Sequence, residues 1–357
     1  MQNVADTRPK TAIAPALLRW WKTHGRKDLP WQQNPTPYRV WVSEIMLQQT
    51  QVATVERYFD RFIAAFPDVT ALANATADQV LHLWSGLGYY GRGRNLHRAA
   101  GLIRDQYTGV LPISYDELLT LPGVGRSTAG AILALSRGQR VPILDGNARR
   151  VLLRVHGIAD WPGSASVAKR LWELAEASTP ERRVAQYTQA IMDLGATVCT
   201  GRNPHCKLCP LASICVARAT GLVAQIPARR PRKSRPRKTT ALALAIVDNR
   251  VLLEKRAPSG IWGGLWSFPE LPNPDAVSHW CQARFGRPPV TIKAWPVISH
   301  SFSHFDLDMT PVEISIDGAD GQVMDGDRWL WYNTEAPAEI GLAAPVAQLL
   351  QAIGDRK

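Results

Sequence analysis

The sequence predicts an α + α/β two-domain protein, in which a long all-α domain precedes a smaller α+β domain. At 357 residues the chain is too long for one ordinary hydrophobic core. Apolar residues follow helical spacing before residue 229 and the alternation of strands after it. A run of seven Lys and Arg without an acid, residues 229–238, separates the two patterns. We therefore predict domains over 1–228 and 241–357, joined by a basic linker over 229–240.

Helices are expected throughout the first domain because apolar residues recur there three and four positions apart. This spacing predicts helices over 52–66, 91–107, 126–136, 145–156, 166–177 and 182–194. Thr76 with Gln79, and Ser114 with Glu117, have the spacing of capping boxes, in which a hydroxyl and a side chain three residues later satisfy the first amides of a helix. Two shorter helices should begin at these positions.

Strands are expected in the second domain. Residues 241–247 and 251–254 are apolar and flank Asp248-Asn249, a pair typical of a hairpin turn. Phe305, Leu307 and Met309 alternate with polar residues, as in a strand with one buried face. Residues 343–353 have the spacing of a closing helix.

The net charge of +12 is unevenly distributed. Residues 1–228 carry +10, whereas residues 239–357 carry −5. A basic first domain and linker favour a polyanion such as DNA as the partner, although the linker run is equally typical of a solvated connection. The first thirty residues lack a signal-peptide pattern, and no apolar run is long enough to cross a bilayer. We expect a cytoplasmic, nucleoid-associated protein.

Four of the five cysteines lie within seventeen residues: Cys199, Cys206, Cys209 and Cys215. A disulfide framework would distribute its cysteines along a small secreted domain, so this cluster indicates a metal centre. Zinc ribbons usually carry two C-x2-C pairs, and the loop 199–215 contains only one. The spacing C-x6-C-x2-C-x5-C therefore favours a 4Fe-4S cluster over zinc.

Three further signals are weak when taken alone. Leu121-Pro122-Gly123-Val124-Gly125 precedes an apolar helix and can bind a phosphate at the helix N-terminus, but it is also an ordinary helix–helix turn. Asp145 follows twenty residues later, where a helix-capping aspartate is the commoner interpretation. Glu44 lies in an apolar helical stretch, where a surface glutamate is the commoner interpretation.

Together these signals carry a specific resemblance. The chain resembles the helix-hairpin-helix DNA glycosylases, and within them the MutY adenine DNA glycosylase family, over nearly its whole length. The resemblance lies in the cysteine loop and in six motifs: Leu29-Pro30-Trp31, residues 43–50 (SEIMLQQT), residues 86–90 (GLGYY), residues 121–128 (LPGVGRST), residues 144–147 (LDGN) and residues 192–196 (MDLGA).

The resemblance implies excision of adenine mispaired with 8-oxoguanine or guanine in double-stranded DNA, after the adenine has been flipped out of the helix. It assigns Glu44 as the general acid that protonates adenine N7 and then helps to activate water. It assigns Asp145 as the ionised carboxylate that stabilises the cationic sugar, and Asn147 as a residue that orients Asp145. Two carboxyl groups with different pKa values suit this chemistry. The resemblance also implies a monomer.

The resemblance implies several DNA contacts. Gln49 and Tyr89 match residues that enter the duplex beside the mispair, and simple packing is their alternative interpretation. Gln189 matches a residue that hydrogen-bonds the extruded adenine. The predicted hairpin contacts are Leu121, Gly123, Gly125 and Ser127, and the loop Phe302-Ser303-His304 of a Nudix-like second domain is expected to recognise 8-oxoguanine.

Three alternative functions are considered. Endonuclease III-like relatives cut the DNA strand with a lysine at the position of Ser127, and serine cannot form the required Schiff base. Pyrophosphate hydrolysis would need a Glu-rich helix for Mg²⁺, but residues 270–290 contain only Glu270 and Asp275 as acids. A non-enzymatic mismatch-binding protein would not need Glu44 together with Asp145. We therefore favour a monofunctional glycosylase that leaves an abasic site; the protein partners stay unknown.

Overall fold

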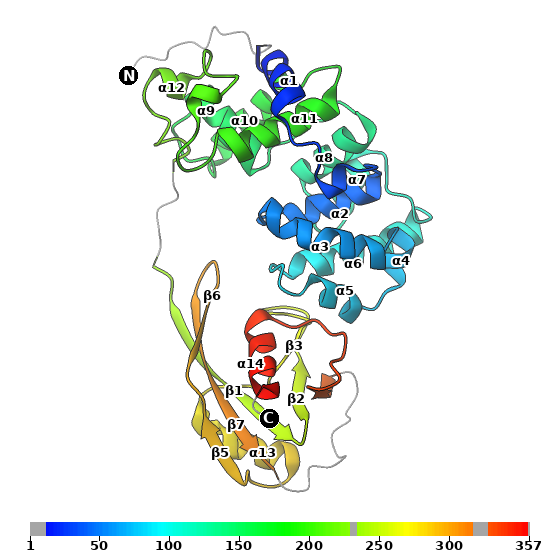
Figure 1. The fold of residues 1–357 in the computed structure, drawn as a ribbon, viewed down its shortest axis with the longest axis vertical. Coiled ribbons are helices and arrows are strands. Elements are labelled where there is room, and N and C mark those ends of the chain that lie inside the picture. Colours follow the sequence, from blue (N-terminus) through cyan, green and yellow to red (C-terminus); the bar gives the residue numbers. More distant parts are fainter. Residues whose placement is uncertain (1–11, 229–233, 317–327, 356–357) are drawn as a thin grey trace. The chain divides into compact units, whose positions relative to one another are not determined.

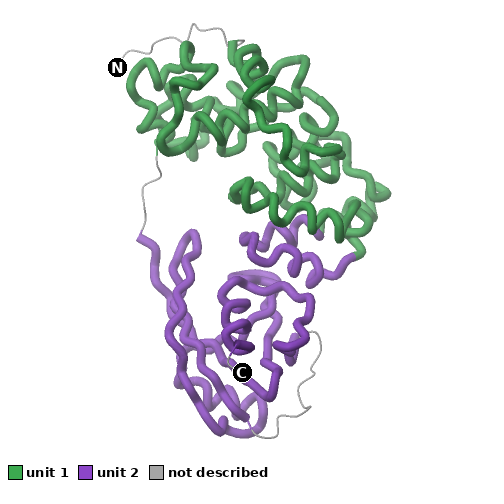
Figure 2. The backbone as a smooth tube through the Cα atoms, in the orientation of Figure 1, with its two compact units in different colours: residues 1–74, 98–231 green, residues 75–97, 232–357 purple. Residues whose placement is uncertain are grey.

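The computed structural model describes residues 12–228, 234–316 and 328–355. They form two compact units, drawn in different colours in Figure 2. Unit 1 comprises residues 1–74 and 98–231, and unit 2 comprises residues 75–97 and 232–357. The first half of the predicted basic run, residues 229–233, lies outside the described residues, and the following strand already begins at Arg237. No described helix is long and apolar enough to cross a membrane.

Unit 1 is helical, as the apolar spacing predicted (Figure 1). Its helices are α1 (Ile13–His24), α2 (Pro37–Leu47), α3 (Val52–Ala65), α4 (Val69–Asn74), α7 (Tyr115–Thr120), α8 (Arg126–Arg137), α9 (Gly146–Val155), α10 (Ala165–Ser178), α11 (Val184–Asp193) and α12 (Val216–Ala219). A 3-10 turn spans Pro30–Gln32, another spans Cys206–Leu208, and a π-helical turn, Leu194–Val198, extends α11. Helix α6 (Gly91–Gln106) begins in unit 2 and ends in unit 1.

The two predicted capping boxes have different outcomes. Thr76 Oγ1 accepts a hydrogen bond from Gln79 N, and Gln79 Oε1 accepts one from the Thr76 amide, so α5 (Ala77–Trp84) begins as predicted. Ser114 makes no side-chain cap bond, although α7 does begin directly after it. The spacing therefore located the start of α7 correctly, but the predicted cap itself is wrong.

Unit 2 contains an eight-stranded mixed sheet and the helical segment 75–97. The strands are β1 (Arg237–Val247), β2 (Arg250–Lys255), β3 (Trp266–Ser267), β4 (Glu270–Leu271), β5 (Thr291–Ala294), β6 (Ile298–Ser301), β7 (Asp306–Ser315) and β8 (Trp329–Asn333). The main order is β3-β2-β1-β7-β5, in which β1 and β7 are parallel and β1 and β2 form the predicted hairpin.

The sheet has an apolar layer on each face. Along β1, Leu242 and Leu244 belong to the apolar cluster that contains α14 (Ala344–Gly354), whereas Ala243 and Ala245 belong to the cluster that contains α13 (Val277–Phe285). A 3-10 turn, Pro274–Ala276, leads into α13. Alternate residues of a strand point to opposite faces, so the near-continuous apolar run of β1 follows from burial on both sides.

Candidate active site

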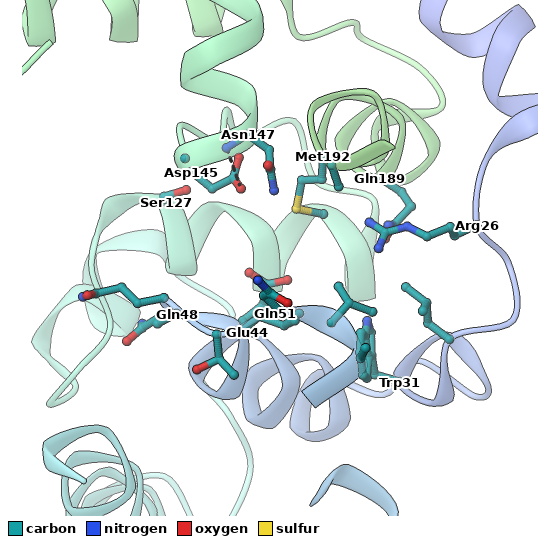
Figure 3. A pocket seen from close by; sticks show the side chains of 18 of the residues that line it. Arg26, Trp31, Glu44, Gln48, Gln51, Ser127, Asp145, Asn147, Gln189 and Met192 are labelled. Atoms are coloured by element: carbon teal, nitrogen blue, oxygen red, sulfur yellow. Dashed lines mark hydrogen bonds between the residues drawn. The ribbon is translucent and has the colours of Figure 1, made fainter. Parts of the chain in front are cut away.

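A pocket of about 800 Å³ in unit 1 brings together most residues predicted for catalysis. The segment between α2 and α3 forms one wall, and the starts of α8 and α9 form another, with α11 beside them (Figure 3). Its lining includes six of the predicted site residues: Glu44, Gln49, Ser127, Asp145, Asn147 and Gln189. The lining also includes Arg26, Gln48, Gln51 and Met192, to which the sequence reasoning assigned no role.

Glu44 projects into this pocket from α2. Its neighbours Ser43, Ile45 and Met46 are buried in the helical core, so the carboxyl is left at the edge of an apolar layer. Burial in the first place, and the negative charge of Asp145 in the second, raise the pKa of Glu44 to about 8. A carboxyl with this pKa is largely protonated at neutral pH and can act as a general acid.

Asp145 lies across the pocket from Glu44 and is also the N-cap of α9 (Figure 3). Its Oδ1 accepts a 2.8 Å hydrogen bond from Ala148 N, and its Oδ2 accepts a 3.1 Å bond from Asn147 N. The capping interpretation is therefore confirmed, and the same side chain also lines the pocket. Two amide donors and the N-terminus of α9 therefore point at the Asp145 carboxyl group.

Asn147 is held by contacts that the sequence did not predict. Its Oδ1 accepts a 2.8 Å bond from Arg150 Nη2, and the same Arg150 nitrogen donates a 2.6 Å bond to Gly195 O. A Cβ atom on Gly195 would lie 2.5 Å from Asn147 Cβ. The π-helical turn after α11 can therefore approach α9 this closely only because residue 195 is glycine.

Asp193 fixes the orientation of Gln189. Asp193 is fully buried and accepts hydrogen bonds from Gln189 Nε2 at 2.9 Å, Trp21 Nε1 at 3.1 Å and the Arg26 amide at 2.9 Å. The Arg26 guanidinium completes the site with an ion pair of 2.7 Å. Because one N–H of the Gln189 amide is bound to Asp193, the Oε1 acceptor and the second N–H are the groups that Gln189 can offer to a ligand.

The glycine hairpin forms the connection between α7 and α8. Gly123 has a φ of +81°, which favours glycine, and Gly125 is the N-cap of α8 without any side-chain cap bond. Leu121 is buried, so its side chain packs in the core. Ser127 Oγ accepts a 3.1 Å bond from Leu144 N and so ties the hairpin to the segment that carries Asp145.

Gln49 in unit 1 and Tyr89 in unit 2 share an uncommon backbone conformation. Their φ angles are +59° and +48°, in the left-handed region that non-glycine residues rarely adopt. Both side chains are exposed, Tyr89 by 51%. Strained, exposed residues of this kind are typical of positions at which a protein meets its ligand.

The four clustered cysteines line one small cavity together with Arg154 and Arg218. Within the described ranges, no three Cys, His, Asp or Glu residues converge closely enough to hold a single metal ion. Arg154 is buried and donates a 3.3 Å hydrogen bond from Nη1 to Cys199 Sγ. Burial, assisted by the neighbouring thiols, raises the pKa of Cys209 to about 11, so a metal centre would have to displace its proton.

The loop 302–304 of unit 2 is anchored by an aromatic cluster. The Phe302 ring lies 4.7 Å from the rings of His300 and Phe305 and 5.5 Å from Trp262. Ser303 and His304 are exposed at the tip of the loop. Phe302 thus serves the packing of the loop, and its two neighbours are the side chains that it presents to solvent.

Comparison with known families defines the class of this protein. Residues 42–177 match the HhH-GPD superfamily of base excision DNA repair proteins, and residues 241–352 match the NUDIX domain. Among solved structures, a thermostable thymine-DNA glycosylase superposes with a TM-score of 0.55 at 26% identity, over 59% of this chain and 97% of its own. An endonuclease III–DNA complex shares the same helical fold, with a TM-score of 0.51 at 20% identity, over 60% of this chain and 98% of its own. The protein is thus a DNA glycosylase of the helix-hairpin-helix class with a NUDIX domain.

Curated relatives narrow the class to one family. The adenine DNA glycosylase of Buchnera aphidicola subsp. Acyrthosiphon pisum is 37% identical over 96% of this chain and 97% of its own. The adenine DNA glycosylase of Homo sapiens is 33% identical over 95% of this chain and 73% of its own. The chain belongs to the adenine DNA glycosylase family. It is an enzyme of base excision repair that binds DNA, and the prediction of family and fold is confirmed.

Proposed function

We propose that the protein hydrolyses the N-glycosidic bond of adenine mispaired with 8-oxoguanine or guanine and leaves an abasic site. The observation that carries this proposal is the pair of carboxyl groups that face one pocket in different surroundings. Glu44 keeps its proton at neutral pH, whereas Asp145 accepts two backbone hydrogen bonds. A pocket of this size accommodates a flipped nucleotide.

Three pocket residues have a task in this reaction. The Glu44 carboxyl donates its proton to the departing adenine and then, as a carboxylate, accepts a proton from the attacking water. The Asp145 carboxylate stabilises the positive charge that develops on the sugar as the bond breaks. Gln189 Oε1 accepts a hydrogen bond from the exocyclic amine of adenine, which distinguishes adenine from bases that carry a carbonyl at that position.

The pocket also supports a reaction without strand cleavage. The lyase reaction of related enzymes needs an amine that attacks the sugar, and here the corresponding position carries the Ser127 hydroxyl. Arg149 and Arg150, on the adjacent helix, carry guanidinium groups, which are poor nucleophiles compared with the amine of a lysine.

We further propose a 4Fe-4S cluster at the four cysteines. A zinc ion draws four ligands to within about 2.3 Å of one point, whereas a cubic cluster binds its thiolates at four separate iron atoms. The four thiols line one cavity, which is what a cluster bound by all four of them requires. When bound, the cluster would supply a rigid cross-link of the loop 199–215, and Arg154 would stabilise the thiolate of Cys199.

The primary experiment is single-turnover incubation of the full chain with an end-labelled duplex containing adenine opposite 8-oxoguanine. Each sample is divided, and one half is treated with hot alkali, which breaks DNA at abasic sites. We expect breaks only after alkali, and none for Glu44→Gln or Asp145→Asn. Glu173→Gln, an exposed carboxyl on α10, is the matched control and should retain the wild-type rate.

Three outcomes would contradict the proposal. Breaks without alkali would reveal a lyase and therefore a nucleophilic amine. Full activity of Glu44→Gln or Asp145→Asn would exclude the assigned roles, and wild-type protein that binds the mispair without excision would leave only mismatch binding. Iron and sulfide analysis of the same preparation tests the cluster independently, since zinc in place of iron would refute that assignment.

A further inference from the structure

Residues 75–97 form one compact unit with the C-terminal sheet, although the family model that covers them is the HhH-GPD model. Leu81 of α5 is 1% exposed and belongs to the same apolar cluster as Leu253 and Phe268 of the C-terminal region. Asp78 accepts hydrogen bonds from Lys255 Nζ at 2.9 Å and from Trp266 Nε1 at 3.2 Å. The segment that carries Tyr89 is therefore built onto the sheet that carries the loop 302–304 (Figure 2).

The backbone of Leu342 is bound on both sides by side chains of this segment. Leu342 N donates a 3.3 Å hydrogen bond to Ser85 Oγ, and Leu342 O accepts a 2.9 Å bond from the Tyr90 hydroxyl. The Tyr90 hydroxyl in turn accepts a 3.3 Å bond from Gly86 N. One hydroxyl thus connects the turn at Gly86 directly to the C-terminal region.

Leu342 cannot shift freely, because the sheet holds the adjacent residue. Trp266 N of β3 donates a 2.9 Å bond to Gly341 O, and Trp266 forms a parallel bridge with Leu342. A Cβ atom on Gly341 would lie 2.6 Å from Leu81 Cβ and 2.9 Å from Leu265 Cδ2. The Leu342 peptide, which is hydrogen-bonded to Ser85 and Tyr90, is therefore closely packed and fixed in position.

The segment before β3 also reaches the loop 302–304. Trp262 packs its ring against His300 and Phe302, at 5.6 and 5.5 Å between ring centres. The next residue, Gly263, accepts a hydrogen bond from Arg94 at the start of α6. Residues 262–266 consequently contact the predicted lesion-reading loop on one side and the Tyr89 segment on the other.

The turn that carries Tyr89 is also stabilised by contacts among its own residues. Trp84 Nε1 donates a 3.1 Å bond to Gly88 O, and Arg92 Nη2 donates a 3.0 Å bond to the same oxygen. The Arg92 guanidinium lies 5.5 Å from the ring centres of both Trp84 and Tyr89. These contacts hold the Tyr89 backbone in its left-handed conformation while leaving the ring exposed.

We propose that Ser85 and Tyr90 are positioning residues that couple recognition of 8-oxoguanine by the loop 302–304 to entry of Tyr89 into the duplex. The inference rests on the proposed function, because it takes the roles of Tyr89 and the loop from there. The Ser85 and Tyr90 hydroxyl groups both bind the Leu342 peptide. Through this peptide they join Tyr89 and the loop 302–304 into one rigid body. Pre-organisation of this kind raises selectivity without any additional contact to DNA.

The test uses variants that remove or restore single hydroxyl groups. Tyr90→Phe and Ser85→Ala each delete one bond to Leu342, and Ser85→Thr keeps the hydroxyl. Tyr58→Phe, on α3 of unit 1, is the matched control. In the full-length Glu44→Gln background, where excision is blocked, we measure the dissociation constants for adenine opposite 8-oxoguanine and opposite guanine. Amide hydrogen exchange of residues 84–92 is followed in the same proteins without DNA.

We expect Tyr90→Phe and Ser85→Ala to lower the preference for 8-oxoguanine about tenfold, and to speed exchange at residues 84–92. Ser85→Thr and Tyr58→Phe should match the parent. The double variant Tyr90→Phe with Ser303→Ala should lose less preference for 8-oxoguanine than the product of the two fold-changes measured for the single variants. The reason is that both substitutions disturb the same rigid body. Multiplicative effects, an unchanged preference, or an equal loss on both duplexes would overturn the coupling.

Failure of the proposed function has a different signature. In that case the parent protein itself shows no preference for 8-oxoguanine and wild type does not excise adenine. The exchange data still decide whether Leu342 holds the turn: unchanged exchange in both variants refutes the inference whatever the enzymatic result.

Discussion

At the scale of single residues, the pocket depends on how each carboxyl is surrounded. Glu44 lies in an apolar layer with a negative neighbour, whereas Asp145 is bound by two amides at a helix N-terminus. Two identical functional groups thereby have different surroundings, which the proposed division of tasks between acid and carboxylate requires. Asp193 has a third environment, fully buried and surrounded by donors, where it orients other groups without facing the pocket.

The Glu44 carboxyl predicts a pH dependence of catalysis. Because its pKa is raised to about 8 and the protonated form is the acid, the single-turnover rate should fall as pH rises through 8. The decrease should approach tenfold per pH unit at higher pH. Rates measured between pH 6 and pH 10 under constant ionic strength test this, and a rate that stays constant to pH 10 would exclude Glu44 as the acid.

The same shift predicts how stability changes with pH. The folded-state pKa lies above the unfolded value of about 4.5, so the folded form binds the proton more tightly. The contribution of this tighter proton binding to the free energy of unfolding is complete below pH 4.5. It declines as pH rises and is lost above pH 8. Relative to Glu44→Gln, wild type should therefore become less stable between pH 5 and pH 9. Urea unfolding of both proteins at each pH measures the difference, and parallel curves would contradict it.

Asp193 yields a prediction about folding and Gln189. Asp193→Asn removes the charge that pairs with Arg26 and replaces one acceptor oxygen with a donor that faces other donors. Breaking a buried ion pair in this way costs about 3–5 kcal/mol. We expect a loss of that order in urea unfolding, together with weaker binding of adenine-containing duplexes. Asp60→Asn, an exposed residue of α3, is the control and should unfold like wild type.

At the scale of elements, the sequence predicted helices and strands well, because the spacing of apolar residues that identifies each element lies within that element. The helices around Glu44 and Asp145 and the β1–β2 hairpin formed where the apolar spacing placed them. What brings the elements together was not predictable from spacing. Arg26 reaches Asp193 across 167 positions, and no local pattern marks such a pair. The absent Ser114 cap shows the same limit, since a matching spacing does not fix a side-chain rotamer.

The close approach of the π-helical turn to α9 gives a prediction at this scale. Gly195→Ala would place a methyl group against Asn147, and overpacking of this kind costs about 1–3 kcal/mol. Because Asn147 adjoins Asp145, we expect the excision rate to fall more than tenfold even where the variant remains folded. Gly101→Ala, a helical position with open space around it, is the matched control. Equal rates for the two variants would show that Asn147 tolerates displacement.

At the scale of the whole molecule, the boundaries of the two units differ from those of the two predicted sequence domains, because residues 75–97 belong to unit 2. The pocket and the cysteine loop lie in unit 1, whereas Tyr89 lies in unit 2 with the loop 302–304. Removal of residues 239–357 would therefore expose Leu81 and deprive the Tyr89 turn of its anchor. A truncation would confound lesion recognition with loss of packing, so single substitutions in the loop are the sharper experiment.

Ser303 provides that substitution. It is exposed at the loop tip, whereas Ser299 is an exposed serine of the same hairpin whose hydroxyl donates to Asp308. Ser303→Ala should reduce the preference for 8-oxoguanine over guanine about tenfold, the effect of losing one hydrogen bond to a polar partner of about 1.4 kcal/mol. Excision of adenine opposite guanine should continue at the wild-type rate, because the pocket in unit 1 is unchanged. Ser299→Ala should leave both rates unchanged. If Ser303→Ala slows both substrates equally, the loop contributes to DNA binding in general and lesion recognition must lie elsewhere in the chain.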